Sequence, residues 1–220
     1  MILKNTLSWF LGAVGFILIL LSVFPLLSYE WESSRKYPTL ISPLSKDESE
    51  KFMFKKRDYT KAENWFNTDK IKVETMSGTN YYSLSIPKLK INNAIVRTDS
   101  DDLSQSLVQF AGAQVPGKRG NTVIFGHSIL PIFFNPENYI SIFSTLYKLD
   151  KGDEIFVNFE DITYRYVVES MFEVRPTDIE VLEQNSDTSY ISLITCTPPG
   201  DPRKPKRLVV RAKIVLSETK

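Results

Sequence analysis

The stretch between Tyr190 and Gly200 constrains the fold more than any other part of this chain. Residues 190–195 are mostly β-branched, aliphatic or aromatic, which is typical of a strand. The Pro-Pro-Gly sequence that follows cannot continue a ladder of backbone hydrogen bonds, so the chain must leave the sheet just after Cys196. A thiol at the end of a strand is held by a rigid element at the rim of a sheet, which suits a nucleophile.

Cys196 is the only cysteine and His127 the only histidine of the 220 residues. Taken alone, a free cysteine is more often a small buried hydrophobic residue than a nucleophile. His127, however, follows a second apolar run, residues 121–125, which predicts another strand that ends at Gly126. A thiolate needs a base or an imidazolium partner, and His127 is the side chain that can serve near neutral pH.

Residues 206–214 predict a further strand, on which Arg207, Val209 and Arg211 share one face. A guanidinium group on the same side as the cysteine could donate hydrogen bonds to an oxyanion. Arg207 and Arg211 are therefore both candidates for this role.

Most of the sequence after residue 80 predicts β-structure. Residues 102–111 instead have helical spacing, with Leu103, Leu107 and Phe110 on one face. Many short strands with only brief helices favour an all-β barrel over a sheet built from βαβ units. The other predicted strands are residues 81–86, 91–96, 154–159 and 162–168, of which the last two form a hairpin.

Residues 7–27 carry no charged side chain. A run of about 21 apolar residues is long enough to cross the ~30 Å hydrocarbon core of a bilayer. No small-x-small cleavage site follows the run, and Trp9, Tyr29 and Trp31 stand where interfacial aromatic residues would flank a span. We therefore expect an uncleaved N-terminal transmembrane helix.

These motifs resemble those of the sortases, which are bacterial cysteine transpeptidases. The resemblance extends over residues 81–216, and it is specific because the motifs share their order and spacing. Ser192 is a departure, since the commonest pattern has threonine there, but a small hydroxyl group is kept. The matching segments are Leu193-Ile194-Thr195-Cys196, His127 after Asn-Thr-Val-Ile-Phe-Gly, Arg207 in Lys-Arg-Leu-Val-Val, Ser85-Ile86-Pro87-Lys88-Leu89, Val115-Pro116-Gly117 and Leu149-Asp150-Lys151-Gly152-Asp153.

The resemblance implies a closed sortase-type β-barrel with short helices. It also implies that the Cys196 thiolate attacks a peptide carbonyl to form a thioester, while His127 stabilises the thiolate and protonates the departing amine. Arg207 then donates to the oxyanion; it is preferred to Arg211 because the Leu-Val-Val after it matches the family pattern. The residues expected to contact substrate are Leu193, Ile194 and Thr195.

The implied substrates are surface proteins with a Leu-Pro-x-Thr-Gly-like sorting signal, and the implied acceptor is an amine of a peptidoglycan precursor or a pilin lysine. The chain then divides into a cytoplasmic tip and anchor (1–28), an extracytoplasmic stalk (29–80) and a catalytic domain (81–220) outside a cell membrane that is crossed once. The Cys-Thr-Pro and Arg-Leu-Val-Val-Arg sequences favour a class C-like or related minor class. Some pilus-building sortases carry a lid, but its Asp-Pro-aromatic signature is absent from the stalk, so no lid is expected.

Other interpretations stay open. A membrane-anchored β-domain scaffold without activity, or a degenerate sortase, would show the same strands. Two other classes of cysteine enzyme fit less well. Papain-like enzymes place cysteine before histidine, whereas here His127 precedes Cys196. The L,D-transpeptidases share this order, but their Ser-x-Gly-Cys sequence is absent. The apolar loop 129–136 either packs as a local plug or forms a wall for substrate side chains.

Metal, cofactor and nucleic-acid binding are not expected. One histidine and one cysteine cannot form a structural zinc site, and the acidic residues lack the spacing of a calcium loop. A net charge of +1 gives no indication of nucleic-acid binding.

Overall fold

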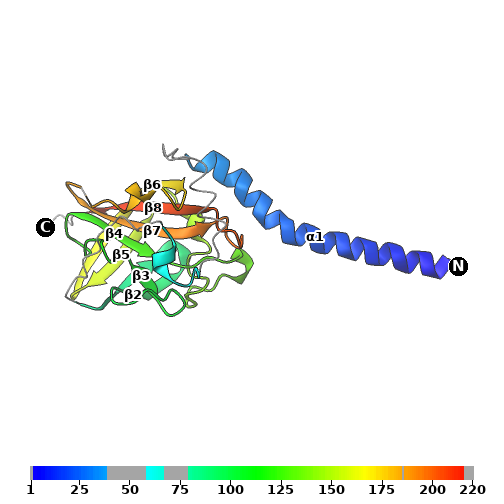
Figure 1. The fold of residues 1–220 in the computed structure, drawn as a ribbon, viewed down its shortest axis with the longest axis horizontal. Coiled ribbons are helices and arrows are strands. Elements are labelled where there is room, and N and C mark those ends of the chain that lie inside the picture. Colours follow the sequence, from blue (N-terminus) through cyan, green and yellow to red (C-terminus); the bar gives the residue numbers. More distant parts are fainter. Residues whose placement is uncertain (1, 39–57, 67–78, 185, 216–220) are drawn as a thin grey trace. The chain divides into compact units, whose positions relative to one another are not determined.

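The computed structural model describes residues 2–38, 58–66, 79–184 and 186–215 of the chain (Figure 1). It divides into two compact units, Met1–Lys36 and Tyr37–Lys220. The first unit is a single helix, α1 (Ile2–Lys36), on which large apolar side chains such as Trp9 and Phe24 are exposed. Within the described part of the chain, no helix combines the length and the hydropathy that a membrane crossing requires. The anchor predicted over residues 7–27 is therefore not confirmed.

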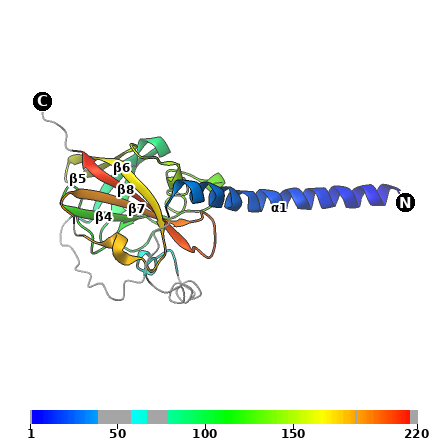
Figure 2. The ribbon, with the colours of Figure 1, turned by 90° about the horizontal axis from the view of Figure 1, so that it is seen from above.

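The second unit is a closed barrel, as the sequence predicted. The strands follow the order β1-β2-β3-β4-β7-β8-β6-β5 around it, and Figure 2 shows β4, β7 and β8 side by side. Short 3-10 helices connect them. The strands are β1 (Tyr81–Ile86), β2 (Ile91–Arg97), β3 (Leu107–Gln109), β4 (Gly120–Phe125), β5 (Glu154–Phe159), β6 (Ile162–Val174), β7 (Ser189–Thr197) and β8 (Lys206–Val215). The 3-10 helices are η1 (Ala62–Asn64), η2 (Pro87–Leu89), η3 (Pro131–Phe133), η4 (Leu146–Lys148) and η5 (Ile179–Leu182).

Alternation along β7 and β8 produces two separate hydrophobic clusters. Leu193, Leu208 and Val210 belong to a large cluster that draws on strands all around the barrel and fills it. Ile194 and Val209 point to the opposite face, where a second cluster forms outside the sheet. This outer cluster contains Cys196, so it marks the face on which the site lies.

The helix predicted over residues 102–111 is wrong. Asp102 Oδ1 accepts hydrogen bonds from the backbone N–H and the hydroxyl of Ser104, which closes a turn and competes with helix formation. The chain then enters β3, which pairs in parallel with β2 and antiparallel with β4. Leu107 and the two residues after it are all buried, so tertiary pairing overrides the helical spacing.

Candidate active site

The three predicted catalytic residues lie at the same end of three neighbouring strands. In the parallel pair β4–β7, Phe125 stands opposite Ile194. His127 and Cys196 each lie two residues after this pair, so the same register continued would place them opposite each other. In the antiparallel pair β7–β8, Cys196 stands directly opposite Arg207. Residues opposite each other in a sheet project from the same face. The register therefore brings the thiol, the imidazole and the guanidinium groups to one place.

Side-chain hydrogen bonds continue this register beyond the end of the β4 ladder. The Thr195 hydroxyl donates to the Gly126 carbonyl oxygen at 2.8 Å, and the Ser128 hydroxyl donates to the Cys196 carbonyl oxygen at 2.6 Å. Gly126 is required here, because a Cβ atom would lie 2.4 Å from the Phe143 ring. The two strand ends are thus tied together on either side of His127, which limits how far its ring can move from the thiol.

Residues 58–66, which we call the cover segment, close the site. Trp65 is fully buried, and its ring centroid lies 5.9 Å from that of His127 and 5.4 Å from that of Phe125. The Trp65 indole N–H donates to the Tyr59 carbonyl oxygen at 2.9 Å, which folds the segment on itself. Cys196 is consequently 2% exposed and His127 6% exposed. This part of the predicted stalk lacks the lid signature, and it nevertheless packs against the site.

Arg207 connects the cover segment to the strand that carries it. The side chain is fully buried, and its Nη2 donates to the Trp65 carbonyl oxygen at 3.0 Å. Nη1 donates to the carbonyl oxygens of Lys204 and Lys206, at 2.8 and 3.0 Å. Nε has no hydrogen-bond partner among the described residues, although it is buried. A buried N–H without a partner is costly, so a peptide carbonyl or oxyanion that reached this donor would gain a hydrogen bond at no loss of an existing one.

Arg211 serves a different part of the molecule. It pairs with Ser192, four positions before Cys196 along β7. Its Nε donates to the Ser192 hydroxyl and its Nη2 to the Val181 carbonyl oxygen, both at 3.3 Å. Arg211 therefore supports the connection before β7, whereas Arg207 is the arginine beside the thiol.

The three residues expected to contact substrate are buried in this structure. Leu193 belongs to the cluster that fills the barrel, and Ile194 lies in the outer cluster with Trp65. The Thr195 hydroxyl is engaged with the Gly126 carbonyl group. The loop after His127 contains η3, on which Ile132 and Phe133 are exposed. These two side chains therefore do not pack as a local plug.

Burial controls the protonation of His127. It lowers the pKa of the imidazole from 6.5 to about 4, and the positive charge of Lys204 acts in the same direction. Asp102 and Asp58 oppose this effect but do not outweigh it. With the cover segment in place, His127 is therefore neutral at pH 7. In this form the ring can accept a proton, but it cannot stabilise a thiolate as an imidazolium ion would.

Acid should destabilise the covered state through this one side chain. The folded pKa lies below the ordinary value, so the unfolded chain binds more protons between pH 6.5 and pH 4. The stabilisation is complete above pH 6.5 and is lost as the pH falls through 4, which amounts to ~3 kcal/mol between pH 7 and pH 4. Urea unfolding of the full chain in neutral detergent measures this loss. A His127→Asn variant should lack it, and an equal loss in both proteins would contradict the assignment.

Removal of Trp65 should expose the thiol. We expect Trp65→Ala to raise the labelling rate of Cys196 by a small thiol reagent at least ~10-fold, because burial of a large aromatic side chain contributes several kcal/mol and ~1.4 kcal/mol corresponds to a factor of ten. Labelling followed by mass spectrometry, well below the unfolding temperature, measures the rate. Trp31→Ala is the matched control, since Trp31 is exposed on α1. An unchanged rate in Trp65→Ala would show that Trp65 does not limit access.

Among the described residues, no three His, Cys, Asp or Glu side chains are grouped in a way that could hold a metal ion.

Comparison with known proteins agrees with this geometry. The family described as Sortase domain matches residues 84–215, which include all eight strands apart from the first residues of β1. The chain belongs to the sortase family. Its similarity to Sortase A of Bacillus anthracis is 30% identity over 138 residues, or 62% of this chain and 60% of that protein. Similarity to Sortase A of Streptococcus agalactiae is 24% over 132 residues, or 60% of this chain and 51% of that protein. This sortase thus spans about half to three fifths of the length of the curated relatives it matches.

Solved structures share the fold of this sortase. The Clostridium perfringens Sortase D5 transpeptidase superposes with a TM-score of 0.53 at 22% identity, covering 87% of this chain and 96% of that chain. The pilus-related Sortase C of Group B Streptococcus superposes with a TM-score of 0.56 at 23% identity, covering 80% and 93%. A lid mutant of Sortase A from Corynebacterium diphtheriae gives 0.53 at 23%, covering 87% and 92%. At such identities these similarities concern the fold alone.

Proposed function

We propose that this chain is a membrane-anchored cysteine transpeptidase that cleaves a Leu-Pro-x-Thr-Gly-like sorting signal and transfers the protein to an amine. The observation that carries the proposal is the placement of His127, Cys196 and Arg207 at the ends of three adjacent strands. Few other functions explain why a thiol, an imidazole and a buried guanidinium group, whose Nε has no hydrogen-bond partner in the described part of the chain, lie on one face. Family membership supports the same chemistry.

In the first half of the proposed reaction, the Cys196 thiolate attacks the threonine carbonyl carbon. A carbon–sulfur bond forms, and the former carbonyl oxygen becomes an oxyanion that accepts hydrogen bonds from Arg207. The carbon–nitrogen bond then breaks, and the His127 imidazolium protonates the departing amine. The products are a thioester on Cys196 and a free glycine amine.

In the second half, the acceptor amine attacks the thioester carbonyl carbon. His127, now neutral, takes a proton from the attacking nitrogen, and the carbon–sulfur bond breaks to regenerate the thiolate. The Trp65 ring lies beside His127 and leaves Cys196 almost fully buried, and burial also disfavours the protonated imidazole that the first half uses. We therefore expect the cover segment to move aside before reaction. The covered structure is therefore the resting form of the proposed enzyme.

The proposed donors are surface proteins that carry the sorting signal, and the proposed acceptor is a peptidoglycan precursor or a pilin lysine. Incubation of the full chain with a Leu-Pro-x-Thr-Gly peptide and triglycine tests the activity, because mass spectrometry separates the ligated product from the hydrolysed one. Ligation is the expected result. An inert scaffold would give neither product and no thioester on Cys196.

The proposed location is the cell membrane, with α1 as a single anchor and the barrel outside the cytoplasm. Its support is the charge-free run over residues 7–27 and the exposed apolar side chains of α1, among them Trp9, Phe16 and Leu18. Protease treatment of spheroplasts should degrade the barrel. Protection of the barrel in intact spheroplasts, with degradation only after lysis, would place it in the cytoplasm instead.

A further inference from the structure

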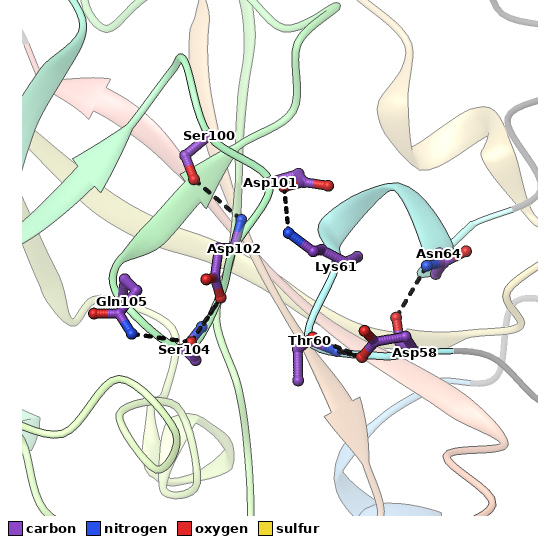
Figure 3. A network of polar contacts seen from close by, with 9 residues as sticks. All are labelled: Asp58, Thr60, Lys61, Asn64, Ser100, Asp101, Asp102, Ser104 and Gln105. Carbon is purple, nitrogen blue, oxygen red and sulfur yellow. Dashed lines mark hydrogen bonds and ion pairs between the residues drawn. The ribbon is translucent and has the colours of Figure 1, made fainter.

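The cover segment is held at a second place, away from the catalytic residues. There it lies against residues 100–105, and Figure 3 shows the polar contacts on both sides. Lys61 and Asp102 form an isolated antiparallel bridge. The Ala62 N–H donates to the Asp101 carbonyl oxygen, and the Leu103 N–H donates to the Thr60 carbonyl oxygen, both at 2.9 Å. The segment is thus held here by a single β-bridge, through backbone groups that accept any sequence, before it turns into η1.

One side-chain contact in this second place is specific for charge. Lys61 Nζ lies 3.0 Å from Asp101 Oδ1 (Figure 3). The neighbouring Asp99 is already paired with Arg97, at 2.8 Å. The Lys61 and Asp101 side chains are 39% and 46% exposed, and an ion pair this exposed contributes little to stability, so it can be exchanged for another. When the cover segment leaves, Lys61 leaves with it.

A cavity adjoins this contact and extends from Asp101 to Phe125. Its volume is about 610 Å³, and its wall includes Val108, Phe110 and Phe125 together with Asp101. Phe125 also contacts the Trp65 ring and lies two residues before His127. The cavity wall is therefore mixed: it has apolar side chains, and it also has three carboxylates, those of Glu63, Asp99 and Asp101. Because Glu63 belongs to the cover segment and Asp99 is paired with Arg97, Asp101 is the carboxylate that stays and loses its cation when the segment leaves.

We propose that Asp101 is a specificity residue that binds a basic side chain of the donor peptide, for which Lys61 is an internal substitute. This inference rests on the proposed transpeptidase function. Lys61 lies four positions before Trp65, the residue that contacts His127. A donor that follows the same path in the same direction, including the turn that η1 makes between Lys61 and Trp65, and that places its threonine beside His127, has at the position of Lys61 the residue that precedes the leucine of Leu-Pro-x-Thr. The proposed enzyme therefore prefers lysine or arginine immediately before that leucine.

Three peptides test the inference with the full chain in neutral detergent. They share a Leu-Pro-Glu-Thr-Gly core and carry lysine, glutamine or glutamate just before it. The lysine peptide should exceed the glutamate peptide about 3- to 10-fold in kcat/KM at 0.05 M salt, as expected for one exposed charge contact that is attractive in one case and repulsive in the other. Asp101→Asn should bring the ratio close to one, and Asp101→Lys should invert it.

Asp161→Asn is the matched control, because Asp161 is an exposed aspartate in the β5–β6 turn. It should keep the preference for lysine. Cleavage of all three peptides at equal rates, or a lysine preference that survives in Asp101→Asn, would overturn the inference and leave the transpeptidase proposal standing. Failure to cleave any of the three, with no thioester on Cys196, would count against the transpeptidase proposal itself.

Discussion

Replacement of Cys196 by alanine is expected to abolish both thioester formation and ligation. Alanine offers no nucleophile, and loss of the nucleophile of a covalent mechanism typically lowers kcat by ~10⁶. The residual rate should fall below detection with a quenched sorting peptide, and the intact mass of the protein should show no acyl adduct. Folding should survive, because alanine fills most of the same buried position at the end of β7.

Val209→Ala is a matched control for this result. Val209 is buried in the same outer cluster, on the neighbouring strand, but its side chain carries no reactive group. The variant should lose stability, since it removes two buried methyl groups, and yet it should still form the thioester. Ligation by Cys196→Ala at a measurable fraction of the wild-type rate would show that the reaction proceeds by another route.

The strands of the barrel were predictable because their side-chain pattern is local. Burial alternates along β1 and β5 as the sequence predicts, and Glu160 and Asp161 adopt the positive φ of the tight turn between β5 and β6. β3 was not predictable, because its residues have helical spacing and its short strand exists only between β2 and β4. A three-residue strand has no period of its own, so its structure is decided by its neighbours.

The candidate catalytic residues could be named from the sequence, whereas their surroundings could not. His127, Cys196 and Arg207 were proposed from motif order, and the register of β4, β7 and β8 explains why they lie at the same end of three adjacent strands. Trp65 is remote from all of them in the sequence, and its local context is a charged segment with scattered aromatic residues. The contact between the rings of Trp65 and His127 joins residues far apart along the chain, and such a contact produces no periodic pattern in the sequence. The hydroxyl of Ser128, which bonds to the Cys196 carbonyl group, could have been suspected only from its place beside His127.

The cover segment and a substrate would compete for the same groups. Arg207 donates to the Trp65 carbonyl oxygen in the covered state, and in the proposed reaction it donates to the oxyanion of the donor peptide. The ring of Trp65 occupies the space beside His127. Movement of one segment therefore releases a hydrogen-bond donor, hydrates the imidazole and exposes the thiol together, so access and activation are coupled.

Replacement of Arg207 by alanine is expected to lower kcat/KM for ligation by ~10²–10³, the usual loss when one oxyanion donor is removed. The same change removes the hydrogen bond to the Trp65 carbonyl oxygen, so the cover segment should open more often. Labelling of Cys196 should then become faster while ligation becomes slower. Opposite changes in these two rates separate a catalytic role from a purely structural one, because a structural role alone would only affect access.

Arg211 supplies the control for this argument. Its guanidinium group bonds to Ser192 and to the Val181 carbonyl oxygen, and it makes no described contact with Trp65. Lysine at either position keeps the charge but loses the planar fork of donors, which the Arg207 site uses in two directions. Arg207→Lys should therefore be severely impaired and Arg211→Lys nearly normal. The reverse order of the two rates would make Arg211 the residue that stabilises the oxyanion, and it would require β8 to shift relative to β7 when the cover segment opens.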